Sequence, residues 1–493
     1  PTVWVNAAKL EEANQETPEK AASAAEKIIN RACQSLRKGN VAINRDQWFK
    51  EAEGAERSAS VLTAGAIIQE VLPVDVDPQD RKRRWMEDAE AFISRGSIAC
   101  ARAVYAVMTR HFPKKKSVWL RAAFLERNHG TKDALFALLR TAVDKEHCPQ
   151  AEILWLMWAK EAWLGQDVEA ARKVLESAFE NNRNNEQIWL AAVKLERKNG
   201  EVERARQLLL RAREQAGKHE RVWVKSAKLE RQCGALETAH ALLTEGVRLF
   251  PKSAKLWLMQ GLNEEDLAAR GGPAGEAHAR NAVQVYSKGL QQCPKSVPLW
   301  LAASRCKEKK GGDKARAVLE RAVLQVPRSP EIWLERVRVE MRAGSHAAAV
   351  KHMANGLREC PTSGVLWAEA IRMEPREKQK SKCVDALKKT EDAVLVAAVA
   401  VVLWRDSKIA KAKSFFQRCV SLAPLYGDGW AFYHRFLARH APEEVAGLEE
   451  RCVRASPTQG EHWRGVRKDA RSEMSVLEVL KATAKRVGSQ CPE

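Results

Sequence analysis

The sequence is short of tyrosine, glycine and proline, and it contains no long apolar segment. Only 4 residues are Tyr, against 16 Trp. The 26 Gly and 18 Pro are too few in 493 residues for a collagen-like or low-complexity chain. With 45% hydrophobic and 30% charged residues, the chain is too apolar for wholesale disorder and too polar for a bundle of membrane helices. These shortages leave a folded chain with an unexplained excess of tryptophan.

Membrane and secretion signals are also missing. The longest apolar run, Ala393–Trp404, is well short of the roughly 20 residues that cross a bilayer. No basic segment followed by an apolar one marks a signal peptide. The 11 cysteines are scattered, with no Cys-x-x-Cys and no Asn-x-Ser/Thr sequon, which is typical of reduced thiols in the cytosol or nucleus. Because the chain opens at Pro1 rather than Met, we expect an N-terminal region of the full-length protein to be absent.

Tryptophan recurs at an interval of about 34 residues. Of 13 successive spacings between the expected anchors, nine lie between 33 and 36. The anchors are Trp4, Trp48, Trp85, Trp119, Trp155, Trp189, Trp223, Trp257, Trp300, Trp333, Trp367, Val396, Trp430 and Trp463. Val396 stands where the period requires an anchor, and only Trp158, Trp163 and Trp404 are out of phase. Such a period predicts one repeat superhelix over residues 1–493, instead of the three or four globular domains that length suggests.

Each unit has the pattern of two helices. A helix A pattern runs about 11 residues from the anchor, and a turn such as Asn199-Gly200 follows. Helix B then has apolar residues on one face, as in 205–212. Proline stands six residues before the next anchor at Pro113, Pro149, Pro251, Pro294, Pro327, Pro361, Pro424 and Pro457. The pattern predicts an all-α, right-handed α-solenoid of about 14 antiparallel helix pairs that form an extended curved arch.

Two further positions recur within helix A. A small residue often stands four after the anchor, as at Ala123 and Gly261, where it lets helices approach closely. Glutamate stands seven after the anchor at Glu11, Glu126, Glu196, Glu230, Glu264, Glu340 and Glu374. A carboxylate near a helix C-terminus opposes the helix dipole, so we expect it to have a basic partner. The hypothesis is a residue at the start of the following helix B, such as Arg206 for Glu196; the alternative is a solvated carboxylate.

Three units depart from the period. The excess between Trp257 and Trp300 maps to 268–279 and predicts an elongated turn within the unit. Between Trp4 and Trp48 we expect extra residues in both turns. The unit between Trp367 and Val396 is shortened around 374–382.

The combination of phased Trp, Glu at +7 and Ala-Arg in helix B resembles the half-a-tetratricopeptide (HAT) repeat. The Ala-Arg element stands at Ala101-Arg102, Ala171-Arg172, Ala205-Arg206 and Ala315-Arg316. Known HAT proteins are scaffolds in RNA processing. Ordinary tetratricopeptide repeats share the length but lack the phased Trp/Glu pair.

Stretches spread along the whole chain resemble the pre-mRNA-processing factor six family of the spliceosomal tri-snRNP. Examples are residues 7–14, 43–48, 80–89, 188–196 and 427–432. The resemblance implies a non-catalytic nuclear scaffold that bridges the U5 and U4/U6 particles through contacts with tri-snRNP proteins. The alternatives are another HAT scaffold, in mRNA 3′-end cleavage or ribosome biogenesis, and a solenoid that binds RNA directly.

No catalytic, metal or cofactor motif stands out. Gly311–Lys314 lacks the Gly-x4-Gly-Lys-Ser/Thr frame of a phosphate-binding loop and is typical of a turn. His434 and His440 are six apart, which does not place them on one helical face as metal ligands. We therefore expect no enzyme activity, no cofactor, no small-molecule substrate and no membrane attachment.

Basic residues cluster near the expected turns. The candidates for contact with a partner or with RNA phosphates are Arg81, Lys82, Arg83, Arg84, Lys114, Lys115, Lys116, Lys309, Lys310, Lys378 and Lys380. The alternative is a set of solvated turns that also stabilise helix C-termini. The net charge of +20 favours an acidic partner, either RNA or an acidic protein segment.

Overall fold

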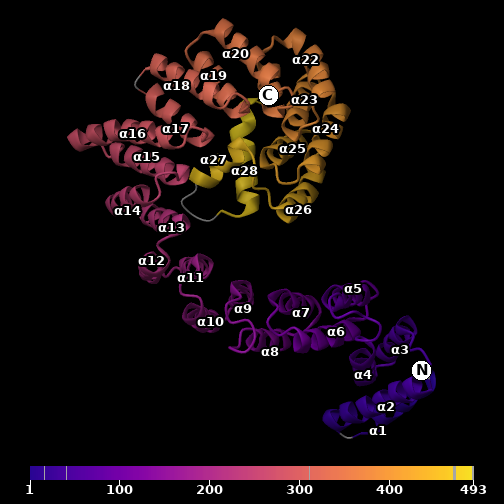
Figure 1. Cartoon of the computed structure of the whole chain (residues 1–493). Helices are drawn as coiled ribbons and strands as arrows, with labels where there is room; N and C mark the ends of the chain where they lie inside the picture. Colours follow the sequence, from indigo (N-terminus) through magenta and orange to yellow (C-terminus); the bar gives the residue numbers. More distant parts are fainter. Residues whose placement is uncertain (16, 40, 310, 470–473, 491–493) are drawn as a thin grey trace. The chain divides into compact units, whose positions relative to one another are not determined.

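The computed structural model describes residues 1–493 except 16, 40, 310, 470–473 and 491–493. The described residues form 28 α-helices and two short 3-10 helices, with no strand; Tyr426 and Gln459 meet in an isolated bridge. The predicted all-α repeat solenoid of helix pairs is thus confirmed (Figure 1). Within this described part, no helix is both long and apolar enough to cross a bilayer.

The chain divides into two compact units, residues 1–229 and 230–493. The helices of the first are α1 (Thr2–Asn14), α2 (Pro18–Lys38), α3 (Arg45–Arg57), α4 (Val61–Val71), α5 (Arg81–Ser94), α6 (Ile98–His111), α7 (Lys116–His129), α8 (Lys132–Ala142), α9 (Glu152–Leu164), α10 (Val168–Asn181), α11 (Glu186–Lys198) and α12 (Val202–Ala216). Helix α13 (Glu220–Gln232) spans the division.

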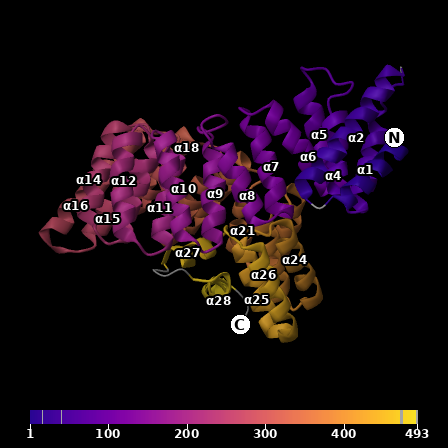
Figure 2. The same ribbon diagram turned by 90° about the horizontal axis from the view of Figure 1, so that it is seen from below.

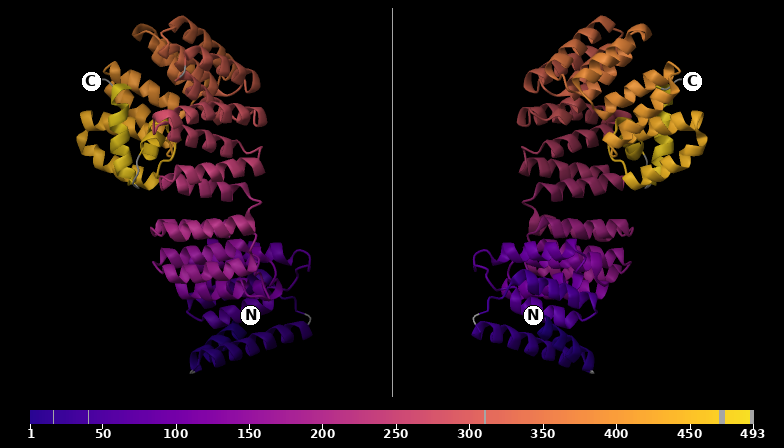
Figure 3. Two further views of the ribbon diagram at one scale, coloured as in Figure 1. Left: turned by 90° about the vertical axis from the view of Figure 1, so that its left-hand side faces the viewer. Right: turned by 90° about the vertical axis from the view of Figure 1, so that its right-hand side faces the viewer.

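The second unit holds the remaining helices. They are α14 (Leu236–Leu249), α15 (Ala254–Ala268), α16 (Gly272–Gln292), α17 (Val297–Glu308), α18 (Gly312–Gln325), α19 (Pro330–Arg342), α20 (His346–Glu359), α21 (Gly364–Met373), α22 (Arg376–Lys389), α23 (Ala393–Arg405), α24 (Ile409–Leu422), α25 (Gly427–His440), α26 (Val445–Ala455), α27 (Glu461–Asp469) and α28 (Val476–Arg486). Within each unit, successive pairs stack as layers (Figures 2 and 3).

The pair α11–α12 shows how the sequence forms one unit. Asn185 caps α11 by accepting a hydrogen bond from the backbone N–H of Gln187 at 2.9 Å. After α11 ends, Gly200 takes φ +84°, a left-handed conformation that costs glycine little. Helix α12 then buries Ala205, Leu209 and other residues of one face. Cap, glycine and apolar spacing thus act together to make a helix pair.

Most anchors of the repeat are buried. Trp48, Trp85, Trp119, Trp155, Trp189, Trp223, Trp257, Trp300, Trp333, Val396, Trp430 and Trp463 are at most 9% exposed. Two anchors differ, since Trp367 is half-buried and Trp4 is 36% exposed. Trp4 lies in α1, the first helix of the first pair. The indole of Trp4 is therefore more exposed than those of the buried anchors.

From Trp119 onward, the phased indoles are also hydrogen-bonded to the backbone of the preceding turn. Trp119 donates through Nε1 to the carbonyl oxygen of Pro113, six residues earlier, at 2.7 Å. The same bond to the residue six before is made by Trp155, Trp189, Trp223, Trp257, Trp300, Trp333, Trp367, Trp430 and Trp463. The Trp–Pro spacing in the sequence is therefore the spacing of a hydrogen bond that locks the turn before helix A.

The irregular units differ from what the sequence predicts. The extra residues near 268–279 lengthen helix α16 to 21 residues and leave only 269–271 between α15 and α16. The expected elongated turn is therefore wrong. In the first unit, α2 likewise has 21 residues and takes up most of the excess that we expected in the turns. Pro375 caps α22 and follows a helix α21 of only 10 residues, which explains the short unit.

Candidate partner-binding surfaces

Three of the glutamates seven residues after an anchor join consecutive repeats. Glu196 accepts hydrogen bonds from Arg172 at both carboxylate oxygens, at 2.8 and 2.6 Å. Glu126 pairs in the same way with Arg102, and Glu340 with Arg316. Each arginine stands 24 residues before its glutamate, in helix B of the preceding repeat. The negative end of the helix dipole disfavours a carboxylate near a helix C-terminus. A guanidinium that binds both carboxylate oxygens offsets this cost.

The predicted direction of this pairing is wrong. Glu196 is held by Arg172 of the preceding repeat and not by Arg206 of the following helix. Helix B packs against the next helix A, so the preceding repeat supplies the partner. The Ala-Arg element at Ala171-Arg172 is the sequence signal that marks this arginine.

The remaining glutamates have other partners. Glu264, 1% exposed, lies between two histidines: its oxygens are 2.6 Å from Nδ1 of His240 and 2.8 Å from Nδ1 of His278. Glu374 pairs with Lys382 at 3.3 Å. Glu11 accepts from Gln15 and Glu230 from Thr238. Since His240 stands where Arg172 stands in its repeat, one joint of the solenoid uses imidazole in place of guanidinium.

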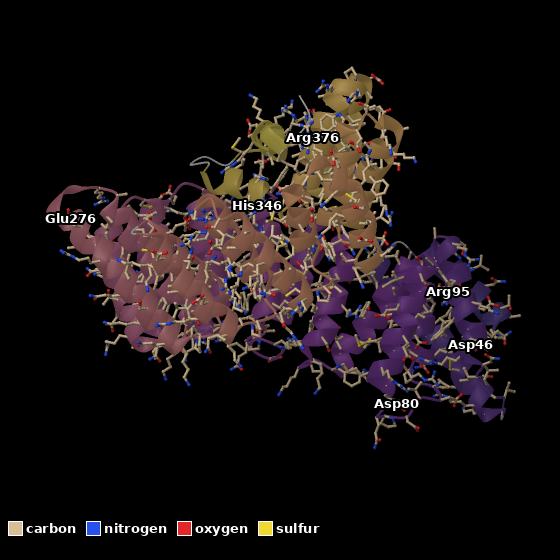
Figure 4. The ribbon with its side chains drawn as sticks, turned by 90° about the horizontal axis from the view of Figure 1, so that it is seen from above. Asp46, Asp80, Arg95, Glu276, His346 and Arg376 are labelled. Carbon is tan, nitrogen blue, oxygen red and sulfur yellow. The ribbon has the colours of Figure 1, made fainter. Side chains whose placement is uncertain are left out.

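Two basic clusters lie at the N-terminal ends of helices. Arg81, Lys82, Arg83 and Arg84 form the first turn of α5, and Lys114, Lys115 and Lys116 precede or open α7. Figure 4 labels Asp80, the residue before the first cluster, at the edge of the ribbon. Because a helix N-terminus is the positive end of the dipole, the proposed stabilisation of helix C-termini does not apply here. The charges of these seven side chains therefore do not stabilise their helices through the dipole.

The other basic candidates are distributed differently. Lys309 reaches Glu265 at 3.0 Å, and Lys380 reaches Asp406 at 3.2 Å, so both take part in ion pairs between repeats. Lys378 is exposed on α22. Lys310 lies outside the described residues. The clusters of α5 and α7 thus belong to the first unit, whereas Lys309, Lys378 and Lys380 belong to the second.

A groove of about 410 Å³ opens in the first unit over α10, α11 and α12. Its walls are mostly charged and its floor is apolar, formed by Leu175, Phe179 and Leu208 among others. Arg172 and Glu196 both line it, so the pair that joins two repeats also shapes the groove. The sequence pattern gives no sign of this groove, because it depends on the gap between two stacked helices B.

The second unit carries a row of arginines five residues after four of its anchors, Trp300, Trp333, Trp367 and Trp430: they are Arg305, Arg338, Arg372 and Arg435. Equal positions in the repeat place them on the same face of their helices A. Arg338 makes a bidentate ion pair with Glu461 of α27, at 2.7 and 2.8 Å, across 123 residues of sequence. The hydrogen bonds from Arg338 lower the pKa of the Glu461 carboxyl. This arginine row was not among the sequence candidates, although its spacing could have revealed it.

Groups suited to metal binding or nucleophilic attack are not assembled in the described part of the chain. No cluster of three or more His, Cys, Asp or Glu in these residues could hold a metal ion. Burial raises the pKa of the Cys383 thiol to about 11 and that of Cys419 to about 12. Such thiols are protonated near neutral pH and are poor nucleophiles.

The chain is similar in sequence to proteins that are named as splicing factors. The family described as "PRP6, TPR-like domain" matches residues 274–484, and a tetratricopeptide repeat model matches residues 162–229. Pre-mRNA-splicing factor prp1 of Schizosaccharomyces pombe is 39% identical over 478 residues, covering 93% of this chain and 49% of prp1. Human pre-mRNA-processing factor 6 is 48% identical over 99 residues, covering 20% of this chain and 10% of that protein.

This chain is a PRP6-family repeat protein. The resemblance noted in the sequence is therefore confirmed at the level of the family. The chain spans about half the length of the fission yeast relative. The PRP6-family model covers helices of the second unit, including the arginine row and the Arg338–Glu461 pair.

Proposed function

We propose that this PRP6-family chain is a non-catalytic nuclear scaffold of pre-mRNA splicing, which bridges the U5 and U4/U6 particles by protein–protein contacts. The observation that carries the proposal is the alignment with a named splicing factor over 93% of the chain. The fold agrees with it, since stacked helix pairs present long surfaces for partners. The grooves and charged rows described above would serve binding rather than chemistry.

A binding experiment with purified particles tests the bridge. The tagged chain is immobilised and exposed to U5 particles, to U4/U6 particles, or to both, and the retained small RNAs are read. A bridge retains each particle alone and both together. Retention of only one particle would contradict the bridge while leaving a scaffold role open. Recovery of a cleavage-factor or nucleolar set from nuclear extract would support the alternative HAT scaffolds instead.

Direct RNA contact is a second candidate, favoured by the basic clusters of α5 and α7. Their charges oppose the local helix dipoles, so the dipole does not explain their position. A salt titration of RNA affinity tests this role. Each phosphate contact steepens the plot of log affinity against log salt concentration by close to one unit of slope. Replacing Lys114, Lys115 and Lys116 by Gln should reduce the slope, whereas an unchanged slope would exclude contact through this cluster.

A further inference from the structure

A pocket of about 260 Å³ lies in the second unit where the arginine row is interrupted. The position five residues after the anchor is Val401 in α23, whereas it is Arg372 in α21 and Arg435 in α25. Because Val401 is short and uncharged, no side chain fills the space above α23 at this position. The pocket is lined by side chains of α21, α22, α23 and α25, together with Tyr426.

The floor of this pocket is apolar. Val394, Ala397, Ala398 and Val401 form a stripe along one face of α23, and Phe432 of α25 adds a ring. Ala397 and Val401 are buried, and Val394 and Ala398 are half-buried. No Asp, Glu, Lys or Arg occurs between 393 and 404. The floor therefore offers no groups for phosphate or base recognition and suits a bulky apolar side chain.

Two arginine side chains lie at the rim of the pocket. Arg372 and Arg405 both line the pocket, and both are exposed. Arg372 donates one hydrogen bond to Glu369 at 2.9 Å, with its side chain 43% exposed. A guanidinium carries five N–H donors, so this bond leaves Arg372 able to take a second carboxylate. The rim is thus suited to acidic groups placed beside an apolar one.

The chain itself shows what this row of arginines binds. Glu461, at the first turn of α27, is held by Arg338 one repeat earlier in the row. Arg372 also helps to lower the pKa of the Glu461 carboxyl through its charge. The pocket therefore continues a surface that already carries one helical carboxylate.

From this pocket and its rim we propose that the second unit captures a short acidic amphipathic segment of a partner protein. A bulky apolar side chain of that segment enters the cavity over Ala398 and Val401. Carboxylates on either side of it pair with Arg372 and Arg405. This inference rests on the proposed function only in taking the partner to be a protein that the scaffold binds.

Binding of a defined peptide to the isolated full chain tests this proposal. The probe is a fluorescein-labelled peptide that repeats Asp-Glu-Leu-Phe, and its affinity is read by fluorescence anisotropy at physiological salt. Two control peptides carry Lys for the acidic residues, or Ser for Leu and Phe. We expect both controls to bind at least about tenfold more weakly, because charge and apolar contact each contribute. Equal binding of all three peptides would overturn the proposal.

Variants locate the binding. Ala398→Trp fills the cavity without changing charge, and Arg372→Glu reverses one rim charge; each should weaken the acidic peptide by about tenfold or more. Arg358→Glu makes the same charge change at an exposed position of α20, outside the pocket, and should leave affinity nearly unchanged. Circular dichroism melts confirm that each variant is folded. Should a folded Ala398→Trp variant bind as wild type does, the pocket is not the site.

RNA is the competing occupant, and the same assay decides it. A fluorescein-labelled uridine-rich oligonucleotide replaces the peptide. If this RNA binds more tightly than the peptide and loses affinity in Arg372→Glu, the pocket is a phosphate site and the proposal is wrong. Because the assay uses the chain alone, failure of the particle bridge would not affect the result.

Discussion

The indole N–H of Trp300 donates a hydrogen bond to the carbonyl oxygen of Pro294, 2.7 Å away. The proline ends the preceding helix pair, and the tryptophan opens the next one. Burial of the indole then packs the new helix, while the bond fixes the turn before it. One contact therefore serves both the core and the connection, which explains why the two residue types recur at a fixed separation of six.

Removing only this hydrogen bond should cost measurable stability. Trp300→Phe keeps an aromatic ring but leaves the Pro294 carbonyl without the indole donor, and we expect a loss of about 1–3 kcal/mol. Trp300→Ala should cost more, roughly 3–5 kcal/mol, because a cavity is added. Urea unfolding followed by circular dichroism measures both. The control is Trp158→Phe, at a half-buried tryptophan outside the phase, where we expect a smaller change. Equal stability of Trp300→Phe and wild type would contradict a role for the bond.

The Arg172–Glu196 pair should stabilise the joint between two repeats. Glu196 is 5% exposed and is held at both oxygens, so Arg172→Met leaves a carboxylate without its partner. We expect a loss of roughly 1–3 kcal/mol, measured by urea unfolding in a double-mutant cycle with Glu196→Met. The exposed pair Arg248–Glu245 of α14 is the matched control, and its removal should change little. A coupling no larger than that of the control would contradict the prediction.

Close packing at the +4 position should make Gly261 hard to replace. Alanine is favoured over glycine by about 1 kcal/mol inside a helix. At Gly261, however, an added Cβ would lie 2.2 Å from the ring of Tyr286. We therefore expect Gly261→Ala to destabilise the second unit by about 1–3 kcal/mol in thermal or urea melts.

Gly447 in α26 provides the control, since an added Cβ there meets nothing within 4 Å. Gly447→Ala should leave stability unchanged or raise it by up to about 1 kcal/mol. If both substitutions had the same effect, the contact of Gly261 with Tyr286 would not be the reason for the cost.

The Arg338–Glu461 pair should make stability depend on pH in the acidic range. The arginine lowers the pKa of Glu461 in the folded protein below its ordinary value of 4.5. The stabilisation is therefore complete above the unfolded pKa and is lost as pH falls through the lower, folded pKa. The urea midpoints of wild type and Glu461→Gln should differ near pH 6 and converge as pH falls below 4.5 and through the lowered, folded pKa of Glu461. A difference that stayed constant over this range would be evidence against the pair.

Thiol reactivity should separate one cysteine from the buried ones. Cys233 is exposed, whereas burial raises the pKa of Cys383 to about 11 and those of Cys419 and Cys452 to about 12. At pH 8 the buried thiols are almost entirely protonated, so they should react with a disulfide reagent only after unfolding. Peptide mapping by mass spectrometry after brief labelling reads each site. Rapid labelling of Cys419 in the folded protein would contradict the buried assignment.

Sequence periodicity accounts for the repeat but not for its irregular units. The Trp phase predicts the helix pairs and even the anchor at Val396, because a residue that must be buried in every unit leaves a regular mark. The extra residues near Ala268 leave no such mark. A given number of extra residues can lengthen either a helix or a turn, and the spacing between anchors does not distinguish the two. Packing against α15 makes most of this segment a helix despite its glycines.

The sequence by itself determined the fold class, the period, the anchors and the family, because these depend on local spacing that repeats along the chain. Only the tertiary structure decided which residues meet between repeats. Arg172 reaches Glu196 because helix B packs on the next helix A, and the fold brings Glu461 of α27 within reach of Arg338 across 123 residues. The hollow over Val401 appears only when four helices surround it. Contacts between distant segments depend on how the layers stack, and no local pattern records that.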